Sequence, residues 1–122
     1  MKGILLFGHG ARNPDWAAPF FRIREEILVR DPSTCVELGF LELMRPTFDE
    51  GIQALVFKGA TEVVVVPIFM AAGSHIKKDL PLMAASAMDK HPSLNITLAA
   101  PVGEAAPVLG AMADYALKPS AS

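Results

Sequence analysis

Apolar residues along this chain recur in short unbroken runs that are separated by longer mixed segments. The clearest run opens residues 63–75, VVVVPIFMAAGSH, where four valines precede Pro67 with no polar residue among them. A β-branched run without alternation is typical of a strand that is buried on both faces. Proline cannot donate to a strand ladder, so the strand is expected to end near Pro67. The pattern therefore predicts a central strand at 62–66, followed by a loop that ends at His75.

The other apolar runs predict three further strands, each associated with a helical segment. The strands are expected at residues 2–7, 34–40 and 94–99. The first helix begins either after an Asn13 cap or near Pro19, and its apolar stripe is expected to consist of Trp16, Phe20, Ile23 and Ile27. The later helices are expected from Pro46 to just before Gly59, from an Asp79 cap (with Pro81 in the first turn) to about Lys90, and from about 104 to 117.

Strands that alternate with helices four times predict a parallel sheet with right-handed crossovers and helices on both faces. The expected fold class is α/β, a doubly wound, mostly parallel four-stranded sheet of the flavodoxin-like order 2-1-3-4. With 122 residues, the chain is expected to form one domain over residues 1–117. Residues 118–122 are expected to be a disordered tail.

Two of the three histidines directly follow predicted strands. His9 has a glycine on each side, and His75 follows a run of small residues. Small neighbours leave an imidazole unshielded and let a ligand approach the backbone, although each histidine could instead pack structurally at its strand end. Both positions fall at the carboxyl edge of the sheet, where open α/β proteins bind ligands, and neutral imidazole binds metals and carries protons. His91, in a His-Pro-Ser turn, is expected to be solvated. The small residues counted with this predicted site are Gly8, Gly10, Gly73 and Ser74.

The loops beyond the strands carry further candidates. Glu42 either faces the same cleft, as a proton acceptor or metal ligand, or is a solvated loop residue. Met70 and Phe69 are candidates for an apolar wall, with core packing favoured for Phe69. Basic side chains beyond the same strand ends would suit a polyanionic ligand, the alternative being a solvated surface. These basic residues are Arg12, Arg45, Lys77 and Lys78.

Composition narrows the function classes. A formal net charge of -2 gives no general affinity for nucleic acid. A single cysteine, Cys35, cannot form an internal disulfide or a structural zinc site, which fits a reducing compartment. No signal peptide is apparent, and no apolar segment approaches the roughly 20 residues that span a bilayer. No nucleotide-binding glycine motif is present either. A cytoplasmic protein without membrane or nucleic-acid partners is expected.

Four segments together resemble a known family. They are LLFGHGAR at 5–12, FLELMRP at 40–46, GATEVVVVPIFMAAGSHIKKDLP at 59–81 and HPSLNITLAAPVG at 91–103. In content and order they are similar to the small single-domain sirohydrochlorin chelatases, the cobaltochelatases and ferrochelatases of cobalamin and siroheme biosynthesis. One departure is Ala11, where the family usually has serine after GHG. This departure removes a hydroxyl that the family would have near its metal ion, but it retains the histidine, His9.

The resemblance implies a chelatase-like fold and a lyase that inserts a divalent metal into sirohydrochlorin. Co²⁺ is the first expectation, with Fe²⁺ or Ni²⁺ as alternatives, and the metal is a substrate rather than a permanently bound cofactor. His9 and His75 are then expected to hold the metal and to help remove the pyrrole protons. A homodimer is implied, because larger relatives contain two such domains.

Two other functions stay open from the residues alone. One is a non-catalytic metal carrier. The other is a phosphoryl-transfer enzyme of the histidine phosphatase type, in which a histidine after the first strand is phosphorylated. Those enzymes have arginine where Gly8 precedes His9 in this chain.

Overall fold

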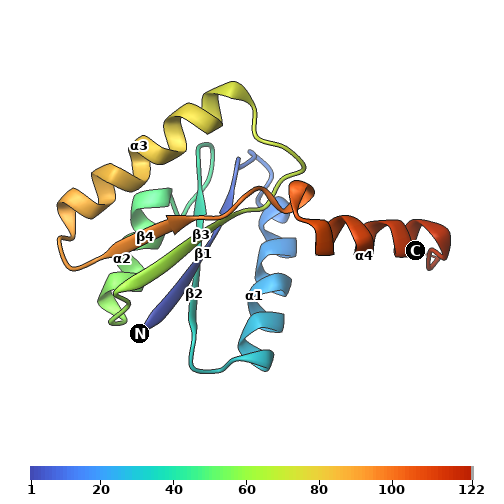
Figure 1. Cartoon of the computed structure of the whole chain (residues 1–122), viewed down its shortest axis with the longest axis horizontal. Helices are drawn as coiled ribbons and strands as arrows, with labels where there is room; N and C mark the ends of the chain where they lie inside the picture. The colour runs from blue at the N-terminus through green and yellow to red at the C-terminus, as the bar shows by residue number, and fades with distance from the viewer. Residues whose placement is uncertain (122) are drawn as a thin grey trace.

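The computed structural model of the chain describes residues 1–121. Its centre is a sheet of four parallel strands in the order β2-β1-β3-β4 (Figure 1). The α/β class and the strand order predicted from the sequence are confirmed. In chain order the elements are β1 (Lys2–Gly8), η1 (Pro14–Ala17), α1 (Ala18–Arg30), β2 (Cys35–Phe40), α2 (Phe48–Phe57), β3 (Glu62–Pro67), α3 (Ser74–Lys90), β4 (Asn95–Leu98), η2 (Val102–Glu104) and α4 (Ala106–Leu117), where η marks a 3₁₀ helix.

The register brings the carboxyl ends of three adjacent strands, β2, β1 and β3, to one height. Phe7 of β1 is level with Gly39 of β2 and Pro67 of β3. The amide of Ile68 donates to the Phe7 carbonyl at 2.8 Å, so the pairing continues one residue past Pro67. The loops that follow β1, β2 and β3 therefore leave the sheet side by side, which is the arrangement that the predicted site requires.

One face of the sheet is fully covered. Its side chains come from alternate positions of β1 and β3 and are at most 1% exposed, namely Leu5, Phe7, Val63 and Val65. Helices α2 and α3 cover them with a buried stripe formed by Ile52, Leu55, Ile76, Leu80, Ala84 and Ala87. The interdigitation of these side chains forms the main core of the protein.

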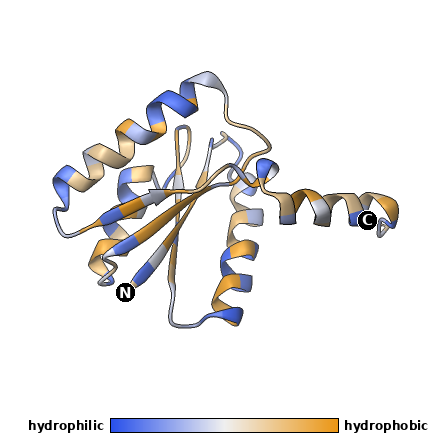
Figure 2. Cartoon of the chain, in the orientation of Figure 1, coloured by the Kyte–Doolittle hydropathy of each residue, from blue (hydrophilic) through white to orange (hydrophobic). Residues whose placement is uncertain are grey.

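The opposite face is covered over only part of its width. Helix α1 packs Phe20, Ile23 and Ile27 against a smaller cluster that is formed by Leu6, Val36, Leu38 and Phe40 of β1 and β2. Helix α4 lies on neither face and extends away from the body (Figure 1), although Figure 2 shows that it is largely hydrophobic. Val64 and Val66 of β3 are consequently half-buried. The sequence predicted that β3 is buried on both faces and that helices cover both faces of the sheet. The side under α2 and α3 agrees with this prediction, whereas the opposite side is covered only in part.

Helix α3 begins six residues earlier than the sequence predicts. Asp79 is not its cap, because the helix starts at Ser74 with Gly73 at the cap position. The early start places Ile76 and Leu80 in register with the alanines that pack on the core, and this burial outweighs the cost of Pro81 inside the helix. The correction matters for function because His75 lies in the first turn of a helix rather than in a loop.

The starts of the first two helices also differ from the prediction. Asn13 and Pro14 begin the 3₁₀ turn η1, in which the Asn13 side chain accepts a hydrogen bond from the Asp15 amide at 2.9 Å. Helix α1 begins only at Ala18, so Trp16 stands outside its apolar stripe and is 65% exposed. Helix α2 begins at Phe48 after a Thr47 cap, and Pro46 therefore precedes the helix.

The last segment of the chain differs from the expected ending in one respect. The predicted final helix is divided into η2 and α4, with Ala105 between them. Residues 118–121 have neither helix nor strand, and Ser122 of the predicted disordered tail lies outside the described residues. Within residues 1–121, no helix is both long and apolar enough to cross a membrane.

Candidate functional site

The loops after β1 and β2 are joined backbone to backbone at the carboxyl edge of the sheet. The amides of Leu41 and Glu42 donate to the carbonyls of Gly8 and His9, at 2.9 and 3.1 Å. Gly10 has a φ of +92°, and a Cβ at this position would lie 1.9 Å from the Glu42 carbonyl oxygen. Only glycine permits this approach. The glycine after His9 therefore lets the two loops meet, which the sequence pattern did not indicate.

His9 stands at the mouth of an apolar cavity. The cavity has a volume of about 400 Å³ and is lined by His9, Gly10, Ala11, Trp16, Pro19, Phe20, Phe40, Met44, Ile68 and Phe69. The imidazole packs on the ring of Phe69, with centroids 4.9 Å apart. The Ala11 amide is 3.3 Å from Met44 Sδ, which accepts its hydrogen bond. The β2 loop and Phe69 thus hold the His9 segment in place while the imidazole itself stays exposed.

His75 lies at the same edge of the sheet but outside the lining of this cavity. It occupies the first turn of α3 and is exposed. Because β1 and β3 are neighbours, the two histidines follow adjacent strand ends, as predicted. Lys77, one turn along from Gly73, lines a smaller cavity of about 130 Å³ with Pro67 and Pro101, at the ends of β3 and β4. The structure therefore brings both histidines to one edge but does not enclose them in one pocket.

The two histidines predicted to bind metal are exposed rather than enclosed. Among the described residues, no three His, Cys, Asp or Glu side chains gather into a ready-made metal cage. Two exposed imidazoles can still supply nitrogen ligands for a borderline ion such as Co²⁺ or Fe²⁺. A site with few protein ligands suits an ion that must be passed on, because the remaining coordination positions are free for another donor.

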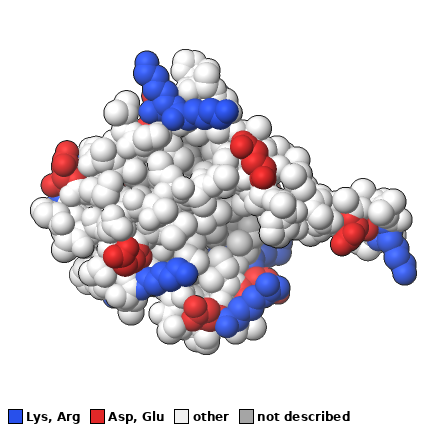
Figure 3. All heavy atoms as spheres, in the orientation of Figure 1, with Lys and Arg blue, Asp and Glu red and all other residues white. Residues whose placement is uncertain are grey.

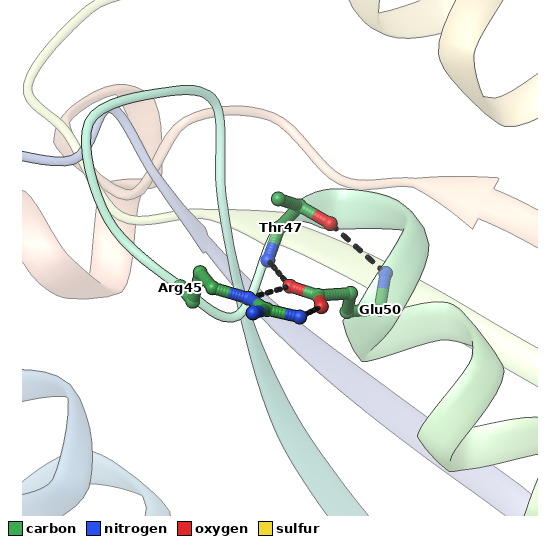
Figure 4. A network of polar contacts seen from close by, with 3 residues as sticks. All are labelled: Arg45, Thr47 and Glu50. Atoms are coloured by element: carbon green, nitrogen blue, oxygen red, sulfur yellow. Dashed lines mark hydrogen bonds and ion pairs between the residues drawn. The ribbon is translucent and has the colours of Figure 1, made fainter.

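The basic residues of the predicted site fall into two groups. Arg45 forms a bidentate ion pair with Glu50, which also accepts from the Thr47 amide at 2.9 Å to complete a capping box at the start of α2 (Figure 4). The hydrogen bond from Arg45 and the one from the Thr47 backbone lower the pKa of Glu50 to about 2. The same pair raises the pKa of Arg45. Arg45 is thus engaged in a local structural role, whatever it contributes to binding.

The other three cations are exposed and have no ion-pair partner within residues 1–121, namely Arg12, Lys77 and Lys78. Glu42 is exposed and lies beside His9 through the backbone contact described above. Met70 is 63% exposed, and its backbone abuts Gly103, where a Cβ would lie 2.0 Å from the Met70 oxygen. Within residues 1–121, these side chains follow the ends of β1, β2 and β3, and no ion pair joins them.

The cavity contains residues that the sequence did not assign to the site. Trp16 and Phe20 are predicted as core residues of the first helix, and Met44 carries no signal beyond its place in the loop after Glu42. These residues line the cavity because Trp16 lies before the start of α1 and because the loop after β2 turns back onto Ala11. Phe69, expected mainly in the core, both packs on the core and contacts His9.

Comparisons with known proteins agree on one family. The CbiX family model matches residues 3–117. The sirohydrochlorin cobaltochelatase of Sulfolobus acidocaldarius is 37% identical over 103 residues, covering 84% of this chain and 80% of that protein. The sirohydrochlorin cobaltochelatase of Priestia megaterium is 37% identical over 107 residues, but this chain spans only 33% of its length. The crystal structure of the sirohydrochlorin chelatase SirB from Bacillus subtilis subspecies spizizenii in complex with cobalt superimposes with a TM-score of 0.79 at 30% identity, covering 97% of this chain and 50% of that one.

Proposed function

The chain belongs to the CbiX family, and we propose that it is a chelatase, a lyase that inserts a divalent metal ion into sirohydrochlorin. Co²⁺ is the first candidate, because the two relatives above are named cobaltochelatases and the SirB structure contains cobalt. Fe²⁺ and Ni²⁺ are the next candidates. The metal is a substrate that leaves with the product, which fits the open arrangement of the two imidazoles. With a lone unpaired cysteine, we place the protein in the cytoplasm.

The observation that carries this proposal is the position of His9. Its exposed imidazole stands at the rim of an apolar cavity of about 400 Å³ and packs on Phe69. A flat macrocycle with carboxylates at its periphery can place part of its apolar face against the cavity while its edge stays in water. Arg12, Lys77 and Lys78 are exposed around the same edge and can meet those carboxylates.

Metal insertion requires two changes at the macrocycle centre. The ion must lose bound water, and two pyrrole N–H protons must leave as the metal takes their place. The two released protons carry away the charge that the divalent ion brings, so the metallated ring has the same charge as the free ring. Imidazoles of His9 and His75 can replace water on the ion and can accept protons near neutral pH. Glu42, held next to His9 by the backbone bond between the two loops, is proposed as a further proton acceptor.

The test is an absorbance assay of sirohydrochlorin with Co²⁺, Fe²⁺ or Ni²⁺, with and without protein. We expect His75→Ala to lose nearly all catalysed insertion and His9→Ala to lose about 100-fold or more, the usual effect of removing a proton-transfer group. His91→Ala, in the turn after α3, is the matched control and should retain wild-type activity. The two losses should not add, because removal of either ligand already defeats their shared task.

Near-normal turnover by a folded His9→Ala, His75→Ala double variant would refute this assignment. Binding of Co²⁺ without any metallation of the macrocycle would indicate a metal carrier instead. An acid-labile phosphate on His9 would indicate a phosphoryl-transfer enzyme.

A further inference from the structure

No polar group of the described chain orients the imidazole of His9. Its backbone is fixed, because the His9 carbonyl accepts from the Glu42 amide at 3.1 Å, so the side-chain torsions decide where the ring nitrogens point. Within residues 1–121, no hydrogen bond or ion pair reaches the ring. A histidine that binds metal is normally oriented by a hydrogen bond to its second nitrogen. Figure 3 shows cationic side chains over the start of α3, the helix that carries His75, and His9 depends on a different contact.

That contact is the ring of Phe69. The centroids of the two rings are 4.9 Å apart, and their planes are inclined by 47°. Within residues 1–121, Phe69 is the one aromatic ring that packs on His9. A phenyl ring at this distance occupies the space beside the imidazole and excludes the rotamers that would swing His9 through it. The exposed edge of the imidazole is thereby directed away from Phe69.

The ring of Phe69 is itself anchored in the main core. It packs edge to face on Phe7, with centroids 6.2 Å apart and planes inclined by 67°. Phe7 is 0% exposed and packs on its other side against Phe48, which is 2% exposed, with centroids 5.9 Å apart. A ring that is fitted against a fully buried neighbour has little freedom to shift, because the core around it is close-packed. Phe69 therefore gives His9 a fixed surface to pack on.

The backbone of Phe69 is held by the segment that follows β4. The Gly103 amide donates to the Phe69 carbonyl at 3.2 Å. A Cβ at Gly103 would lie 2.0 Å from the carbonyl oxygen of Met70 and 2.3 Å from its Cα, so only glycine permits this approach. On the preceding residue, the Ile68 amide donates to the Phe7 carbonyl at 2.8 Å. Phe69 is thus fixed between β1 and the segment after β4, and the chain leads from it toward His75 in α3.

We propose that Phe69 is a positioning residue for metal insertion. Its ring fixes the direction in which His9 presents its nitrogens to the ion, and the Gly103 contact fixes Phe69. This inference rests on the proposed function, because Phe69 acts through His9 and needs no contact with the metal. The displacement of a reacting group by about 1 Å can lower a rate about 100-fold. Loss of the ring should therefore slow the chemical step more than it weakens binding of the macrocycle.

The first experiment separates positioning of His9 from a direct contact with the macrocycle, since Phe69 also lines the cavity. Phe69→Leu removes the ring and keeps an apolar side chain. We expect kcat for metal insertion to fall about 10- to 100-fold, with KM for sirohydrochlorin near the wild-type value. Phe69→Tyr keeps the ring and should retain most of kcat.

Phe48→Leu is the matched control for these kinetics. It removes the aromatic neighbour on the other side of Phe7, leaves Phe7 in place and does not touch His9. Both kcat and KM should therefore stay near the wild-type values. A Phe69→Leu variant with raised KM and unchanged kcat would show that the ring binds the macrocycle, and it would overturn the positioning role. Circular dichroism of each variant verifies folding.

The second experiment observes the imidazole by NMR in the full chain, without metal or macrocycle. The protein carries labelled histidine and is held at about pH 8.5, where free imidazole is neutral. The ring C–H peaks of His9 are assigned by their loss in His9→Ala. The ring current of Phe69 should displace these peaks from those of His91. Phe69→Leu should abolish this displacement, and Phe69→Tyr should keep it.

Gly103→Ala tests the same ring from its backbone. The added Cβ cannot fit beside residue 70, so it should shift Phe69 and reduce both the displacement of the His9 peaks and kcat. Across all variants, kcat should fall only where the displacement is lost, and a variant that loses one without the other would overturn the proposal. Undisplaced His9 peaks in the wild-type chain would refute the role of Phe69 alone. Absence of metal insertion by the wild-type chain would instead refute the proposed function, so the two failures are distinguishable.

Discussion

The two faces of the sheet differ although the same residue type supplies both. Val63 and Val65 are 1% and 0% exposed beneath α2 and α3, whereas Val64 and Val66, alternating with them along β3, are only half-buried. Hydrophobicity and strand propensity are identical at the four positions. What differs is which helices return to each face, because α2 and α3 pack back onto the sheet and α4 does not.

This difference sets how much each face contributes to the stability of the fold. The covered face is closed within one chain, so its packing contributes to the free energy of unfolding of a single copy. The open half of the other face contributes less, because no helix of the same chain covers it. Stability should therefore respond differently to substitution on the two faces.

The largest expected difference comes from truncating adjacent residues of β1. Leu5 points to the covered face and is 0% exposed, and Leu5→Ala should lower the free energy of unfolding by about 3–5 kcal/mol through lost burial and a residual cavity. Ile4 is half-buried on the other face, and Ile4→Ala should cost about 1–2 kcal/mol, below the usual range for a closed core. Urea unfolding at fixed protein concentration measures both. Equal losses would mean that the two faces are equally closed in solution.

Adding a methyl group should change stability in opposite directions in the packed helix α2 and in the projecting helix α4. At Gly51 of α2, a Cβ would lie 2.4 Å from the Leu38 carbonyl oxygen and 2.5 Å from Leu5 Cδ1, so Gly51→Ala should destabilise by about 1–3 kcal/mol. At Gly110 of α4, no atom lies within 4 Å of the added Cβ. Gly110→Ala should therefore stabilise the helix by up to about 1 kcal/mol. Thermal unfolding at low concentration tests the pair. A destabilising Gly110→Ala would mean that this side of α4 is packed in solution.

The smallest expected effects on stability concern the residues at the starts of α2 and α4. Helix α2 starts with the Thr47–Glu50 capping box, whereas α4 follows Ala105 without any side-chain cap. Thr47→Ala should cost about 1 kcal/mol of stability. The contribution of Glu50 should be pH-dependent, because its pKa falls from 4.5 to about 2 on folding. A lowered pKa stabilises the fold above the unfolded value and loses that effect as pH falls through the folded one.

The stability advantage of the wild-type chain over Glu50→Gln should therefore be complete above about pH 4.5 and vanish as the pH approaches 2. Urea unfolding of both proteins across this range measures it. Arg45→Gln should give the same profile, since it removes the other half of the pair. A constant difference between wild type and Glu50→Gln at all pH values would contradict this reading of the ion pair.

The predicted site shows which of its features can be predicted from local patterns in the sequence and which cannot. The placement of His9 and His75 just past adjacent strands follows from the two apolar runs and from the strand order, because parallel strands end at one edge. The cavity beside His9 does not follow in this way, since Trp16 and Phe20 reach it from the segment of η1 and α1, whereas Met44 reaches it from the loop after β2. Leu43, in the same β2 loop, has a φ of 69° with no glycine to signal it. The neighbouring bond between Glu42 and His9 is long-range, and no local preference could predict it.

By itself, the sequence determined the fold class, the strand order, the edge that carries the histidines and the family resemblance, because each depends on periodicity or on contiguous motifs. Only the tertiary structure decided where α3 begins, since burial of Ile76 and Leu80 outweighs the local preference of Asp79 for a cap. It also decided that Arg45 is paired with Glu50 and that α4 leaves the sheet. The start of α3 and the course of α4 depend on contacts between residues that are distant in the chain, and such contacts have no period in the sequence. Arg45 and Glu50 are only five residues apart, but their pairing depends on how the loop after β2 enters α2.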